Sequence, residues 1–164
     1  MISRENAIEE LYRIFEHLEV PMDKRIIAEM DKDELEFVKS LPKEEQEAYK
    51  EEADTTREKC IAAIEKERLF LNENGKIEYK LRFPILTREG VLLFDKIVMQ
   101  ERWTAGTRRN NMKGIKAGDG DDLMGLVYAE LACRCGKTRM QIEMMDDYDV
   151  KVLQAINSLF MRAD

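Results

Sequence analysis

The chain has 164 residues, of which 44% are apolar and 37% are charged. This composition excludes a wholly disordered protein, and the length suits one globular domain with or without a helical appendage. The net charge of −7 is unevenly divided, because residues 1–75 carry −9 and residues 76–164 carry +2. An acidic first half disfavours general binding to DNA or to membrane surfaces.

The sequence shows no signal for secretion or membrane insertion. No apolar run approaches the roughly 18 residues of a membrane span, and the first residues do not resemble a signal peptide. Three cysteines without a secretion signal favour a reducing compartment. We therefore expect a soluble cytoplasmic protein that does not bind membranes.

The spacing of apolar residues predicts helices throughout the first half. Ser3 is a suitable N-cap for a helix over residues 4–18, whose apolar residues recur every three or four positions. Shorter helices are predicted around residues 26–30 and 35–41. Pro42 favours the start of a long helix running from about Lys43 to Phe70. Residues 1–72 are thus predicted to form an acidic helical segment.

The apolar period changes to two after the turn pair Asn74-Gly75. Apolar and charged residues alternate over 77–83, a pattern that predicts a strand ending near Pro84. A turn over 87–90 and a partner strand over 91–99 complete an antiparallel β-hairpin. Because two strands alone are marginally stable in water, helices or another chain must cover the hairpin.

Helices are predicted again after the hairpin. A polar region over 104–120 is expected to form a short helix and a loop, and a helix from Leu123 should end at Gly136 in a left-handed cap. Thr138 is a suitable cap for a short helix, and a last helix runs from about Asp149 to Phe160. Residues 73–164 are therefore predicted as a hairpin covered by C-terminal helices. The whole chain is predicted to be an α+β protein that is mostly helical.

Three motifs resemble known functional sites, but ordinary structural roles explain them better. His17 is the only histidine, so it has no partner for a metal site or proton relay and is expected to be structural or solvated. Cys133 and Cys135 lie two apart on a helix and face different directions, which suits buried thiols better than zinc. Gly136-Lys137-Thr138 lacks the earlier glycine of a phosphate-binding loop. We expect no catalytic residue, cofactor or metal.

An acidic stretch over 118–122 is the remaining place for enzyme chemistry. Its spacing does not match a calcium loop, and a helix cap explains Asp121 or Asp122. An enzyme would need a pocket that gathers carboxylates such as those of Asp119, Asp121 and Asp122.

One basic cluster and many methionines are candidates for binding a partner. The cluster beside Trp103 comprises Arg102, Arg108, Arg109, Lys113 and Lys116. A solvated loop is favoured over a contact with phosphates or an acidic partner, because no second aromatic residue or known nucleic-acid motif accompanies the cluster. A third interpretation is that the cluster contacts the acidic N-terminal half, within the chain or between subunits. The chain has ten methionines, and several of them lie in the second half. Their flexible side chains can fill the hydrophobic core or form an adaptable binding surface.

Residues 76–161 resemble the tail assembly chaperones of contractile-tailed bacteriophages and related prophages. The likeness consists of the strand Tyr79–Pro84, the turn Glu89-Gly90 with its second strand, and Thr104-Ala105-Gly106. A leucine-rich helix, a short segment and an Asp-led helix ending in an aromatic residue follow in the same order. The sequence departs from the family at Trp103 and Thr107, and residues before Asn74 have no counterpart.

The resemblance implies a non-enzymatic role in prophage tail assembly. Such chaperones bind the helical tape-measure protein and keep it soluble until tube subunits polymerise around it. The tail tube protein is a second possible partner, and an exposed hairpin edge suggests a homo-oligomer. We expect partner binding at Trp103, Arg108, Arg109, Met140, Met144 and Met145. The alternative function is a regulatory module that binds nucleic acid through the basic loop 102–116.

Overall fold

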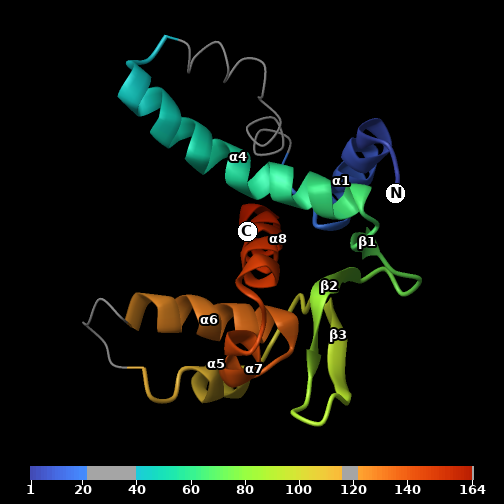
Figure 1. The fold of residues 1–164 in the computed structure, drawn as a ribbon, viewed down its shortest axis with the longest axis vertical. Coiled ribbons are helices and arrows are strands. Elements are labelled where there is room, and N and C mark those ends of the chain that lie inside the picture. The colour runs from blue at the N-terminus through green and yellow to red at the C-terminus, as the bar shows by residue number, and fades with distance from the viewer. Residues whose placement is uncertain (22–39, 116–121, 164) are drawn as a thin grey trace. The chain divides into compact units, whose positions relative to one another are not determined.

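The computed structural model describes residues 1–21, 40–115 and 122–163, and shows an α+β fold as predicted from the sequence (Figure 1). It divides into two compact units, residues 1–67 with 154–164 and residues 68–153. The short helices expected around 26–30 and 35–41 lie outside the described residues, apart from positions 40 and 41.

Helix α1 (Arg4–His17) confirms the first predicted helix of the chain. The Ser3 side chain accepts a hydrogen bond of 3.3 Å from the backbone N–H of Asn6, so the predicted N-cap satisfies a donor that the helix itself leaves unpaired. One face of the helix is buried in the first unit; it consists of Ala7, Leu11, Ile14 and Phe15.

Helix α4 (Lys43–Glu65) begins after Pro42, as predicted, but ends five residues before the predicted end at Phe70. Its last turns bury Cys60, Ile61, Ala63 and Ile64. Arg4 from α1 makes two hydrogen bonds, of 2.6 and 3.0 Å, to the carboxylate of Glu58 on α4. This bidentate pair and the buried faces join the two helices.

The residues that follow α4 form a strand that the sequence analysis missed. Strand β1 (Leu69–Leu71) pairs in antiparallel fashion with β2 (Ile77–Leu86), with Leu69 opposite Tyr79. The Asn74-Gly75 turn joins them, and Gly75 adopts a φ of +70°, which costs a glycine little. Backbone pairing to β2 therefore overrides the helical spacing that extended the predicted helix to Phe70.

Strand β3 (Leu92–Val98) completes a three-stranded antiparallel sheet in the order β1-β2-β3. The register between β2 and β3 is interrupted, since Lys80 lies opposite Lys96 whereas Ile85 lies opposite Phe94. Residues 81–84 of β2 thus face the single residue Asp95 of β3. Pro84, which cannot donate to a ladder, lies in this bulge.

The carboxylate of Asp149, in the first turn of α8 (Asp147–Ala163), binds the bulge. It accepts a hydrogen bond of 2.7 Å from the Tyr79 hydroxyl and bonds of 2.9 and 3.0 Å from the backbone N–H groups of Arg82 and Phe83. Asp149 is fully buried. Burial and this hydrogen bond raise the pKa of Tyr79 above its ordinary value of 10, so the phenol remains a donor.

Three further helices belong to the second unit: α5 (Ala105–Asn111), α6 (Asp122–Cys135) and α7 (Arg139–Glu143). Gly136 has a φ of +60°, and Thr138 forms a capping box with Gln141 at the start of α7. Both predicted helix signals are confirmed. The backbone N–H of Gln100, just after β3, donates a hydrogen bond of 2.6 Å to the Arg134 carbonyl, which ties α6 to the sheet.

We predict that Asp149→Ala lowers the free energy of unfolding by about 3 kcal/mol, because it leaves three donors without their acceptor in a buried site. Tyr79→Phe removes one donor and should cost about 1 kcal/mol. Urea denaturation followed by circular dichroism measures both. The matched control is Asp147→Ala, which removes an exposed carboxylate from the same helical turn. Equal urea midpoints for Asp149→Ala and Asp147→Ala would contradict the role assigned to Asp149.

We also predict that the Arg4–Glu58 pair stabilises the protein at neutral pH and not in acid. The hydrogen bond and charge of Arg4 lower the pKa of Glu58 below its ordinary value of 4.5, even though burial opposes the shift. A lowered folded-state pKa gives stability that is present above the unfolded-state value and is lost as the pH falls through the folded-state value. Glu58→Gln should therefore destabilise the chain at pH 7, by less than about 1 kcal/mol because the pair is partly exposed. The difference from wild type should disappear well below pH 4.5 in pH-dependent urea titrations; a difference that persists there would contradict this role.

Candidate functional site

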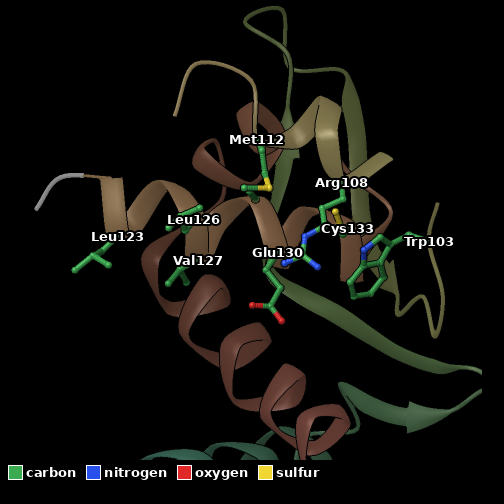
Figure 2. A pocket seen from close by; sticks show the side chains of 9 residues that line it. Trp103, Arg108, Met112, Leu123, Leu126, Val127, Glu130 and Cys133 are labelled. Carbon is green, nitrogen blue, oxygen red and sulfur yellow. The ribbon is translucent and has the colours of Figure 1, made fainter. Parts of the chain in front are cut away.

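A cavity of about 340 Å³ opens between α5 and α6 in the second unit (Figure 2). We call it the α5/α6 groove. Its lining consists of Trp103, Arg108, Met112, Leu123, Leu126, Val127, Ala129, Glu130 and Cys133. The lining is mainly apolar and includes one cation and one carboxylate, a composition typical of sites that bind an apolar ligand in a fixed orientation.

Helix α6 supplies an apolar stripe to the groove. Leu123, Leu126 and Val127 are 67, 41 and 40% exposed, and Glu130 follows one turn later. The spacing of three, four and seven residues places these four side chains on one helix face. The other face of α6 is buried and contains Leu131 and Ala132. The helix is therefore apolar on two faces, of which only one is covered within the described chain.

The wall opposite α6 is positioned by a stacked pair. The guanidinium of Arg134 lies 4.7 Å from the centre of the Trp103 ring and donates a hydrogen bond of 2.8 Å to the Gln100 carbonyl. Arg134 is buried, so its charge is held between the indole face and backbone carbonyl groups. Directly after Trp103, the Thr104 hydroxyl caps α5 by accepting from the N–H of Thr107 at 3.1 Å.

This cap fixes the first turns of α5, from which Arg108 reaches the groove. Figure 2 shows the Arg108 side chain extending into the space between Trp103 and Glu130. The groove thus combines an apolar floor with two opposite charges that can orient a bound chain.

The six partner-binding residues predicted from the sequence fall in three environments. Trp103 and Arg108 line the groove, whereas Arg109 is exposed on α5 outside its lining. Met140 and Met144 are 72 and 48% exposed at α7. Met145 is only 7% exposed, so its side chain belongs to the packed interior. The structure brings two of the six predicted residues together and distributes the other four outside the groove lining.

The basic and acidic stretches singled out in the sequence are only partly described. Arg102, Arg109 and Lys113 are exposed, and Lys116 lies outside the described residues. Asp119 and Asp121, considered as carboxylates of an enzyme, also lie outside them, and the side chain of Asp122 is not described. The structure therefore shows no arrangement of these carboxylates.

All three cysteines are free and buried, as expected for Cys133 and Cys135. Burial raises the pKa of the Cys135 thiol to about 12, which keeps it protonated at neutral pH. Among the described residues, no three His, Cys, Asp or Glu side chains gather to hold a metal ion. Within the same residues, no helix has both the length and the apolar character needed to cross a membrane.

Comparison of the chain with protein-family models, with curated protein sequences and with solved structures gave no match in any of the three.

The sequence predicts a helix from Leu123 to Gly136, and the groove residues of α6 were not among the predicted partner-binding residues. A signal for their second role was present, because the apolar residues of segment 123–135 are too many for one helix face. A helix that is apolar all round is either fully buried or waiting for a partner. Met112 gave no such signal, since it stands alone in a polar segment.

We predict that Arg134→Ala loosens the wall of the groove. The chain has one tryptophan, so its fluorescence reports on Trp103 alone. Loss of the stacked guanidinium and its hydrogen bonds should move the emission maximum to longer wavelength and lower the free energy of unfolding by about 2 kcal/mol. Arg109→Ala, which removes an exposed arginine of α5, is the matched control. Identical emission spectra for the two variants would show that Arg134 does not hold the indole.

Proposed function

We propose that this protein is a non-enzymatic chaperone of prophage tail assembly, which binds an apolar helical segment of the tape-measure protein in the α5/α6 groove. The observation that carries the proposal is the exposed stripe of Leu123, Leu126 and Val127 beside Trp103. Contiguous exposed apolar side chains of this kind mark binding surfaces. The resemblance of residues 76–161 to tail assembly chaperones supplies the identity of the partner.

The groove suits a helical ligand. An amphipathic helix buries residues spaced by three, four and seven positions when it lies in an apolar groove, and α6 presents the same spacing from its own side. Trp103 provides a large aromatic contact at the end of the groove nearest α5, of the type that dominates binding energies. Polar groups flanking the apolar face of the ligand can pair with Arg108 and Glu130, which would fix its direction.

Binding of this kind requires no catalytic residue in the chaperone. An apolar helix that would aggregate when exposed gains burial in the groove, and release requires only that tube subunits compete for the same helix. In this proposal the chain acts in the cytoplasm of the bacterial host before the tail tube forms. The tail tube protein is a second candidate partner, since it must replace the chaperone on the tape-measure protein.

Co-expression with the tape-measure protein of the same prophage tests the function. The chain should bring that protein into the soluble fraction and be recovered with it in a pull-down. Val127→Glu and Leu126→Glu place a charge in the groove and should weaken binding about tenfold or more. Met161→Glu makes the same change at an exposed methionine of the first unit and should bind like wild type.

Other outcomes assign the binding differently. Loss of binding in Met140→Glu with full binding in Val127→Glu would move the site from the groove to α7. No recovery of the tape-measure protein by the wild-type chain would overturn the proposed function.

Nucleic-acid binding is the second candidate function. It is favoured by three exposed cations, Arg102, Arg109 and Lys113, which could contact phosphates. Fluorescence anisotropy with short DNA and RNA duplexes separates the candidates, because binding to phosphates weakens steeply with salt. We expect no salt-sensitive affinity. A strong salt dependence that Arg109→Glu abolishes would favour the regulatory module instead.

A further inference from the structure

Two side chains of opposite charge line the α5/α6 groove from its two walls. Arg108 belongs to α5, and Glu130 belongs to α6. Both are exposed, and neither forms an ion pair or a side-chain hydrogen bond with another residue that the structure describes. In the same unit, Arg139 and Lys151 each pair with a carboxylate one turn away on their own helix. The two groove charges can therefore pair with a bound chain.

The two ends of the groove differ from each other. Trp103 is held at the C-terminal end of α6, where the Arg134 guanidinium lies 4.7 Å from the centre of its ring. Leu123 belongs to the first turn of α6, about 16 Å of helix axis from Arg134. Figure 2 shows Trp103 and Leu123 at opposite ends of the lining. A helix lying along α6 therefore has one end near Trp103 and the other near Leu123.

A helix that lies in the groove on its apolar face presents one flank to each wall. In coiled coils, residues that flank the apolar face form the ion pairs that set helix orientation. Turning such a helix end for end keeps the apolar face on the floor but exchanges the two flanks. A helix with an acidic residue on one flank and a basic residue on the other can thus pair with both Arg108 and Glu130 in one direction only. In the opposite direction each charge meets a like charge.

We propose that Arg108 and Glu130 set the direction in which an amphipathic helix of a partner lies in the α5/α6 groove. The helix carries an acidic residue on the flank that faces α5 and a basic residue on the flank that faces α6. This inference rests on the proposed function for its helical ligand and adds the charge pattern by which the ligand is selected. The apolar stripe supplies affinity, whereas the charge pair determines direction and disfavours helices with like charges on both flanks.

Trp103 allows the direction of a bound helix to be measured on the full-length chain, because it is the only tryptophan and lies at one end of the groove. The probes are two synthetic helices of about 14 residues, or about 21 Å, with identical apolar faces and with Glu and Lys exchanged between the flanks. Each carries a nitroxide, a short-range quencher of indole fluorescence, at its first or its last residue. Only one labelled end of each peptide should quench Trp103, and the two peptides should differ in which end it is.

Reversal of both groove charges provides the matched variant. In the double variant Arg108→Glu with Glu130→Arg, the walls exchange signs, so the quenching end should change in both peptides. Arg109→Glu reverses an exposed charge outside the groove lining and should behave like wild type. Quenching from the same end for both charge orders, equal quenching from both ends, or no binding of either peptide by the wild-type chain overturns the inference.

Single charge reversals test the selection between peptides. Arg108→Glu makes both walls negative, so it should bind a peptide with Lys on both flanks about tenfold more tightly than one with Glu on both flanks. Glu130→Arg makes both walls positive and should show the reverse preference. Both preferences should weaken in about 1 M salt. Because both residues are exposed, the circular dichroism spectra should not change. The same order of affinities in the two variants would contradict the role of the charge pair.

These outcomes are separate from those of the pull-down that tests the proposed function. Recovery of the tape-measure protein, together with peptides that bind in one direction whatever their charge order, overturns this inference and leaves the function in place. Loss of that recovery, together with peptides that turn with their charge order, overturns the function and supports the charge pair as a selector for another helical partner.

Discussion

The buried carboxylate of Asp149 is the constraint around which the second unit is organised. Four residues of β2 face one residue of β3, so the N–H groups of Arg82 and Phe83 lie where the ladder is interrupted. The carboxylate accepts from both and from the Tyr79 hydroxyl, and it does so from the first turn of α8, where a negative charge is favourable. One side chain thus fixes the start of the last helix against the bulge. Without this acceptor the buried Tyr79 hydroxyl and the part-buried N–H groups of Arg82 and Phe83 would lose their partner, which is why an acidic residue suits this buried position.

The two faces of helix α6 have different roles. Its buried face packs in the second unit, and Arg134 at its end holds Trp103 and the chain that leaves β3. The exposed face supplies the floor of the groove. Because both faces belong to one rigid helix, the groove is built on the same element that stabilises the unit. A site built on a packed helix is partly pre-formed, and pre-formed sites lose less conformational entropy on binding.

Much of the fold follows from the sequence, and the exceptions have physical causes. Ser3, Gly136 and Thr138 end or begin helices through local backbone chemistry, so each could be identified from its residue type and neighbours. Strand β1 could not be identified by periodicity, because three residues are too few to distinguish a strand from the end of a helix, although the Asn74-Gly75 turn signals a hairpin.

The candidate site was predictable in part. Trp103 and Arg108 were singled out as an aromatic residue beside cations, but Leu126 and Val127 look like core residues until the structure shows that one face of α6 is uncovered. Exposure depends on how elements pack, and residue type alone does not determine it.

The interruption between β2 and β3 also divides the hairpin into two parts of unequal local stability. On the inner side, Ile77, Tyr79 and Ile97 are buried, and opening their hydrogen bonds requires disruption of the packed unit. On the outer side, Ile85 is buried but Leu86 and Leu92 are half exposed, so less buried surface opposes the separation of the strands there. Amide protons of the outer part should exchange with solvent through local fraying, whereas those of the inner part exchange only in large-scale opening. We therefore expect the bulge to separate two parts of a single hairpin that open with different free energies.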